Sequence, residues 1–291
     1  MATDLQAIVD DLAAESSVLT DVLERLGPRQ WLLETPAQGW TIADQVSHLA
    51  YFDGAMRQSV VDPTRFRRDA DKILATGDDF PDRIAAQYRG RSGSELLSWF
   101  QSERMQLVEA YRQVDPGRRL PWYGPDMSPA SSVTARLMET WAHGQDVFDT
   151  VGVDRVATRR LRHVAHIGVG ALPYSYSVNQ LPQPGEPVRV ELAAPDGTRW
   201  SWGSPDAANS VTGDALEFCL VVTQRRHLGE TGLVVNGPVA EQWMAIAQAY
   251  AGPAGTGRAL RNDGSGSVAK TDSIGGTNER RGPDPATPRQ R

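Results

Sequence analysis

The chain has 291 residues, of which 40% are hydrophobic and 23% are charged, so it is long enough for two domains that each bury a core. Its formal net charge of -6 excludes the basic surface that is typical of nucleic-acid-binding proteins and of proteins attached to anionic membranes. A single cysteine, Cys219, excludes a disulfide framework and a cysteine-rich zinc module. We therefore expect no nucleic-acid or membrane partner, and histidine and carboxylate must bind any metal.

The N-terminal segment, residues 1–8, lacks the basic stretch and apolar core of a secretory signal. No run of the sequence approaches the roughly 20 apolar residues that are needed to span a bilayer. These two observations predict a cytoplasmic protein.

Residues 1–154 are predicted to form a bundle of four helices. Apolar residues recur at helical spacing over residues 5–26, and Thr41 with Asp44 forms a capping box for a second helix over residues 42–60. Residues 62–93 are polar and contain several prolines and glycines, so we interpret them as a long connection with one short helix near residues 83–88.

The third and fourth helices of the bundle each begin at a serine. Ser94 is predicted to cap the third helix, which Pro116 and Gly117 end. Ser128 is predicted to cap the fourth, with Pro129 at its first helical position, and this helix should run to about Thr150.

A second, smaller domain of α+β type is predicted over residues 155–251. Short β-rich runs at residues 188–192 and 198–202 flank an Asp-Gly hairpin signal, and a further short strand is expected at residues 233–235. The helices of this domain are expected at residues 158–171, 214–227 and 238–250. Residues 252–291 contain almost no apolar side chains, which predicts a disordered tail. The predicted fold class is therefore α+β, with a helical bundle first.

The candidate chemistry lies on the second and fourth helices. Glu139 and His143 are four residues apart, which places both on one face of the fourth helix, and His48 on the second helix is the best candidate for a third ligand. Two imidazoles and one carboxylate would leave open positions for water or substrate. From spacing alone, a solvated helix face for Glu139 and His143 and a core histidine at His48 remain the commoner interpretations.

Two segments of the sequence resemble a known family of metalloproteins. Residues 39–49 read GWTIADQVSHL, which is similar to the second-helix signature of the DinB-like metalloproteins. Residues 139–146 read ETWAHGQD and resemble the fourth-helix motif of the actinobacterial mycothiol-dependent maleylpyruvate isomerase branch, which adds a C-terminal α+β domain. The resemblance extends over roughly residues 5–250 and is close to an uncharacterised subgroup known only as metal-binding. It implies a DinB-like four-helix bundle whose metal ligands are His48, Glu139 and His143.

The resemblance also implies a function. It predicts a metal-dependent enzyme, a thiol transferase or isomerase, that acts on a small electrophilic metabolite with mycothiol as cosubstrate. Imidazole and carboxylate suit zinc, nickel, iron or cobalt, and we expect zinc. A thiol-independent lyase, cyclase or hydrolase and a non-catalytic metal-binding interaction module remain alternatives.

Several other residues are candidates for supporting roles. Asp146 or Asp44 would orient a ligand imidazole through its second nitrogen, although Asp44 is more simply explained as part of the helix cap. Arg225 or Arg226 would hold an anionic substrate group, because guanidinium binds carboxylate with two hydrogen bonds. Trp141 would line the substrate pocket, and core packing is the alternative for this residue.

His163 and His166 form a rival pair of candidate ligands on a predicted helix. They are three residues apart, and no carboxylate lies near them in the sequence. Surface or interdomain packing is the simpler interpretation of this pair.

Overall fold

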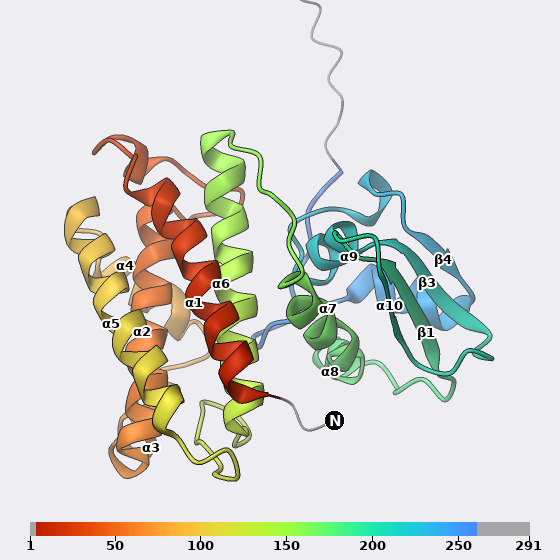
Figure 1. Ribbon diagram of the computed structural model, residues 1–291, viewed down its shortest axis with the longest axis horizontal. Helices are drawn as coiled ribbons and strands as arrows, with labels where there is room; N and C mark the ends of the chain where they lie inside the picture. Colours follow the sequence, from red (N-terminus) through yellow and green to blue (C-terminus); the bar gives the residue numbers. More distant parts are fainter. Residues whose placement is uncertain (1–3, 261–291) are drawn as a thin grey trace, which may run out of the picture. The chain divides into compact units, whose positions relative to one another are not determined.

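The computed structural model describes residues 4–260, and these residues belong to one compact unit. Four long helices run side by side in its N-terminal part (Figure 1). They are α1 (Leu5–Leu23), α2 (Ile42–Val61), α5 (Gly93–Gln113) and α6 (Pro129–Val151). Within the described range, no helix is both long and apolar enough to cross a membrane.

Local capping explains where α2 and α6 begin. The Thr41 side chain accepts from the backbone N–H of Asp44, and the Asp44 carboxylate accepts from the backbone N–H of Thr41, which is the predicted capping box. Ser128 caps α6 ahead of Pro129, as predicted, and Gly152 ends this helix with a left-handed conformation, φ 67°. These caps fix the two helices that carry the candidate ligands.

The connection between α2 and α5 is more helical than predicted. It contains α4 (Phe80–Gln87), which corresponds to the short helix expected near residues 83–88, and also α3 (Pro63–Leu74), which was not expected. Pro63 begins α3 instead of breaking a helix, because the Asp62 side chain caps the same turn and proline is favoured at the first helical position. The cap of α5 is Ser92 and not Ser94.

The C-terminal part combines a four-stranded mixed sheet with four helices. The strands are β1 (Val188–Ala193), β2 (Arg199–Trp202), β3 (Asn209–Asp214) and β4 (Val234–Asn236). Their order is β2-β1-β3-β4, with β1 parallel to β3 and the two edge strands antiparallel to their neighbours. The helices are α7 (Leu161–Gly170), α8 (Leu172–Val178), α9 (Ala215–Val222) and α10 (Pro238–Ile246). Single 3₁₀ turns occur at Gln30–Leu32 and Leu228–Glu230.

This arrangement confirms the predicted fold class, a helical bundle followed by a smaller α+β region. Strand β3 and helix α8 were not expected from the sequence. The predicted helix over residues 214–227 ends at Val222, shortly before Gln224 adopts a positive φ of 59°.

One buried apolar cluster extends from the bundle into the C-terminal region. It includes Leu137 and Trp141 of α6, Leu161 of α7 and Phe218 of α9. Because α6 packs against α7 and α7 packs against α9, the helix that carries two candidate ligands is fixed from both regions of the fold.

Candidate metal centre

The structure brings His48, Glu139 and His143 together between α2 and α6. One ligand atom from each side chain lies within 4.8 Å of the others. The Glu139 Oε2 atom is 3.1 Å from His143 Nε2 and 3.5 Å from His48 Nε2. We call these three residues the ligand cluster. The helical spacing of Glu139 and His143 accounts for their pairing, and the packing of α2 against α6 brings in His48.

The spacing of the ligand atoms fits a divalent metal. Ligand bonds of about 2.0–2.2 Å at tetrahedral or octahedral angles place neighbouring donor atoms about 2.8–3.6 Å apart. The two separations between Glu139 Oε2 and the imidazole nitrogens fall in this range, and all three ligand atoms lie within 4.8 Å of one another. The Nδ1 atom of His48 is buried and has no hydrogen-bond partner among residues 4–260. The orientation of the His48 ring, with Nε2 toward Glu139, is therefore not set by a hydrogen bond at Nδ1.

The electrostatic environment keeps two of the ligand side chains deprotonated at neutral pH. Burial, followed by electrostatic repulsion from the neighbouring His143, lowers the pKa of His48 from 6.5 to about 4. Burial alone would raise the pKa of Glu139, but hydrogen bonds and positive charge from His143 and His48 lower it well below its usual value. At neutral pH the site therefore offers a neutral imidazole at His48 and an ionised carboxylate at Glu139.

Aromatic rings flank the two imidazoles. The Trp40 ring lies 5.7 Å from the His143 ring and nearly parallel to it, at 18°, and 5.2 Å from the His48 ring. Phe52 contacts His48 with a ring-centre distance of 4.5 Å. The Glu139 and His143 side chains keep 20% and 13% of their exposure, so the ligand cluster is shielded by rings but still open to solvent on the α6 side.

Gln45, which sequence reasoning did not single out, makes the hydrogen bond that orients a ligand. Its side-chain Oε1 contacts Nδ1 of His143, the ring nitrogen that faces away from Glu139. Gln45 lies 98 residues before His143, so no local pattern in the sequence connects the two.

The carboxylates proposed to orient an imidazole have other partners. Asp44 takes part in the cap of α2 and pairs with Arg89, at 2.8 Å. Asp146 is fully buried between Arg225 and Arg258. Neither carboxylate hydrogen-bonds to an imidazole within the described chain. The simpler interpretation of Asp44, a capping residue, accounts for its Oδ2 contacts with Thr41, and Arg89 binds the other carboxylate oxygen.

Arg258 lies inside the segment predicted to be a disordered tail. The structure describes residues 252–260 of that segment, without helix or strand, and pairs Arg258 with Asp146. The rest of the predicted tail, residues 261–291, lies outside the described residues.

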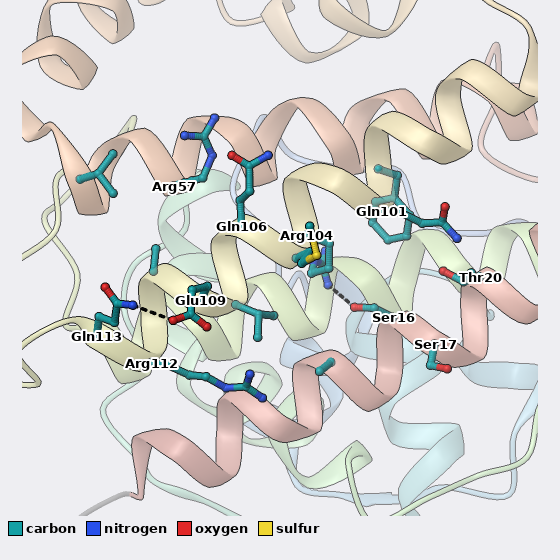
Figure 2. A pocket seen from close by; sticks show the side chains of 16 residues that line it. Ser16, Ser17, Thr20, Arg57, Gln101, Arg104, Gln106, Glu109, Arg112 and Gln113 are labelled. Carbon is teal, nitrogen blue, oxygen red and sulfur yellow. Dashed lines mark hydrogen bonds between the residues drawn. The ribbon is translucent and has the colours of Figure 1, made fainter.

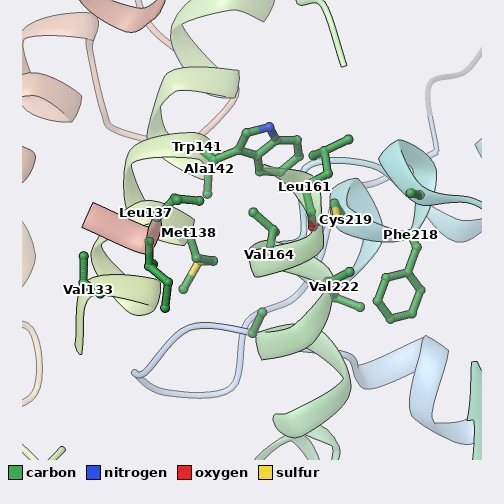
Figure 3. Close-up of a cluster of buried hydrophobic side chains, with 14 of the residues drawn as sticks. Val133, Leu137, Met138, Trp141, Ala142, Leu161, Val164, Phe218, Cys219 and Val222 are labelled. Atoms are coloured by element: carbon green, nitrogen blue, oxygen red, sulfur yellow. Dashed lines mark hydrogen bonds between the residues drawn. The ribbon is translucent and has the colours of Figure 1, made fainter. Parts of the chain in front are cut away.

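The candidate substrate-binding residues have partners outside the ligand cluster. Arg225 pairs with Asp146 at 2.9 Å and also donates to two backbone carbonyls. Arg226 is half-buried beyond the end of α9. Trp141 is buried in the apolar cluster, where Figure 3 shows it beside Leu161. Core packing therefore accounts for Trp141, and Arg225 is already neutralised by a carboxylate.

The rival histidine pair is not gathered into a second cluster. His163 Nε2 contacts Asp11 Oδ2 of α1 at 2.8 Å, a simple pair between α7 and α1. Among residues 4–260, the ligand cluster is the one group of three histidine or acidic side chains close enough to share a metal ion.

A second polar cluster joins the same two helices to α5. The Asp53 carboxylate of α2 accepts from Arg104 of α5 at 2.7 and 3.0 Å and from Arg136 of α6 at 3.0 Å. Arg104 also donates to Ser16 and Thr140. We call Asp53, Arg104 and Arg136 the arginine cluster; all three are buried.

A surface groove lies between α1 and α5. Figure 2 shows Arg104 reaching from α5 to Ser16 within it. No member of the ligand cluster lines this groove, so it is separate from the candidate metal centre.

Comparisons with known proteins show the family of the chain. Residues 12–148 match the family described as mycothiol maleylpyruvate isomerase N-terminal domain. Two uncharacterised proteins of Mycobacterium tuberculosis, one from strain CDC 1551 and one from a second strain, are each 46% identical over 250 residues, which is 86% of this chain and 97% of theirs. The chain and these relatives therefore belong to the mycothiol maleylpyruvate isomerase-like family. The predicted resemblance is thereby confirmed, including its uncharacterised actinobacterial relatives.

Solved structures show the same fold. The crystal structure of the mycothiol-dependent maleylpyruvate isomerase matches with a TM-score of 0.57 and 15% identity, covering 81% of this chain and 96% of that one. A variant of that isomerase with one histidine replaced by alanine matches with a TM-score of 0.56 and 14% identity over the same shares. A second family, described as wyosine base formation, matches residues 184–236, which hold the sheet and α9.

Proposed function

We propose that the protein is a metal-dependent enzyme that uses a low-molecular-weight thiol of the mycothiol type to isomerise a small electrophilic metabolite or to transfer the thiol onto it. The observation that carries the proposal is the convergence of two imidazole nitrogens and one carboxylate oxygen in a domain of the mycothiol maleylpyruvate isomerase family. The isomerase whose fold it shares is itself described as mycothiol-dependent.

The ligand cluster would hold the metal through His48 Nε2, Glu139 Oε2 and His143 Nε2. For this ion we propose zinc, which would supply the Lewis acidity that lowers the pKa of a thiol and makes thiolate available at neutral pH. The neutral His48 and the ionised Glu139 provide the lone pairs, and Trp40 and Phe52 keep water from the faces of the rings. The partly exposed side of Glu139 and His143 is the approach for cosubstrate and substrate.

The thiol has to come from outside the protein. Cys219 is the chain's single cysteine, and it is buried in α9, where Sγ donates to the Leu161 carbonyl. Burial raises the pKa of its thiol well above the usual value. Cys219 therefore cannot serve as the nucleophile, which supports a diffusible thiol cosubstrate.

The proposal is tested with the purified, zinc-loaded full chain, mycothiol and an electrophile. Maleylpyruvate tests isomerisation, and monochlorobimane reports thiol transfer by fluorescence. We expect thiol-dependent turnover that His48→Ala abolishes and Cys219→Ser leaves intact. Turnover of the electrophile without thiol would instead favour a metal-dependent lyase, cyclase or hydrolase. Zinc binding without turnover of either electrophile would contradict the proposed activity and favour a binding module.

A further inference from the structure

Gln45 joins a loop of the bundle to a residue of the ligand cluster. It lies in the first turn of α2, three residues before His48, and is fully buried. Its side-chain Nε2 donates to Thr35 Oγ1 at 2.9 Å, and its Oε1 contacts Nδ1 of His143. The two ends of one amide therefore have different partners, one in the loop before α2 and one on α6.

The loop determines which way this amide points. The Thr35 hydroxyl has one proton, and it donates that proton to the Trp40 carbonyl at 2.8 Å, because a carbonyl oxygen can only accept. Thr35 Oγ1 is then left as an acceptor for Gln45. The NH₂ group of Gln45 must face Thr35, so the oxygen must face His143.

The orientation of the amide fixes the tautomer of His143. An amide oxygen accepts only, so Nδ1 of His143 must carry the proton, and Nε2 of the neutral ring keeps its lone pair. That lone pair faces Glu139 Oε2 at 3.1 Å. In the neutral ring, Nε2 and Glu139 Oε2 are two acceptors directed at one position. A proton on Nε2 satisfies both as the hydrogen bond to Glu139, and a metal cation would take the place of that proton.

The same loop also restrains the His143 ring from its face. Trp40, whose carbonyl accepts from Thr35, places its indole ring parallel to the His143 ring. The Thr35 backbone N–H donates to the same Trp40 carbonyl at 2.7 Å, which closes the turn. The ring of His143 is therefore held in its plane by Gln45 and across its face by Trp40.

We propose that Gln45, anchored by Thr35, is a positioning residue that holds His143 in the tautomer protonated at Nδ1 and aims its Nε2 at the metal. This inference rests on the metal centre of the proposed function and on the hydrogen bonds that join buried Gln45 to Thr35 and His143. A hydrogen bond of this kind raises the affinity of a ligand histidine by fixing its ring and its tautomer.

The test combines zinc affinity with a direct measurement of the tautomer in the full chain. Zinc affinity is measured by competition with a chromophoric chelator, and the His143 tautomer is measured by ¹⁵N NMR of histidine-labelled protein. Gln45→Leu keeps the size of the side chain and removes both hydrogen bonds, so we expect zinc affinity to fall about 10- to 100-fold and the Nδ1–H signal of His143 to weaken.

Two further variants separate positioning from packing. Gln45→Glu keeps an acceptor against Nδ1, so we expect it to restore zinc affinity to within about threefold of the wild-type protein. Ser59→Ala removes another buried hydrogen bond of α2, from Ser59 to the Pro121 carbonyl, and should leave zinc affinity unchanged. If Gln45→Leu does not fold, Thr35→Val, which frees the amide to turn over, should lower zinc affinity in the same direction.

Unchanged zinc affinity and an unchanged His143 tautomer in Gln45→Leu or Thr35→Val would overturn the inference. Its failure is distinguishable from failure of the proposed function. If the wild-type protein binds no zinc, the metal centre itself is refuted. The NMR experiment on the metal-free protein still decides whether Gln45 sets the tautomer of His143.

Discussion

Two polar clusters join α2 to α6, one of them with α5 as well, and they differ in how their hydrogen-bonding groups are satisfied. In the arginine cluster, each carboxylate oxygen of Asp53 accepts from a guanidinium, and Arg104 also donates to two hydroxyl groups. In the ligand cluster, the Nε2 atoms of His143 and His48 converge on Glu139 Oε2, and His48 Nδ1 has no partner within the described chain. Charges that are paired with one another indicate a structural role, and converging ligand atoms beside an unpaired ring nitrogen indicate a binding site.

The largest effect on stability is expected in the arginine cluster. Asp53→Asn removes the one carboxylate between two buried guanidinium groups, which should lower the free energy of unfolding by about 3–5 kcal/mol. Urea unfolding measures this change. Asp10→Asn is the control, because Asp10 and its partner Arg112 are exposed and should contribute less than about 1 kcal/mol. Equal losses in the two variants would show that the arginine cluster does not stabilise the fold.

The ligand cluster should affect stability mainly through the metal. At a free zinc concentration of 100 times Kd, binding to the folded state should add about 2.7 kcal/mol to the free energy of unfolding. Thermal unfolding with zinc, compared with a chelator, measures this gain. Glu139→Gln should reduce the zinc-dependent shift strongly, whereas Asp53→Asn, if folded, should retain it. The account would be wrong if Glu139→Gln showed the same shift as the wild-type protein.

The smallest effect is expected at the cap of α2. Asp44→Ala removes the carboxylate that accepts from the Thr41 backbone, and it should cost about 1 kcal/mol of folding free energy. Zinc affinity should not change, because Asp44 does not reach an imidazole. A loss of zinc affinity in this variant, measured by chelator competition, would assign Asp44 to the metal centre after all.

The sequence predicted the parts of the site that depend on local patterns. The capping residues Thr41 and Ser128 mark where the two helices begin, and the four-residue spacing pairs Glu139 with His143. His48 was included through the family resemblance, because its position opposite α6 depends on how the helices pack. That these three residues bind a metal stays a prediction.

The parts that were missed depend on contacts between distant segments. Gln45 and His143 are 98 residues apart, and Arg258 pairs with Asp146 over 112 residues, so periodicity and composition carry no signal for either contact. Helix α3 was missed for a different reason. Pro63 was interpreted as a helix breaker, although the capping carboxylate of Asp62 before it indicates a helix start.

The metal content of the protein tests the central claim most directly. Elemental analysis of the natively purified full chain should find about one divalent metal ion per chain, and His48→Ala, Glu139→Gln and His143→Ala should each lose most of it. Asp44→Ala should retain the metal of the wild-type protein. Full retention of the metal in Glu139→Gln or His143→Ala would contradict the assignment of the ligand cluster.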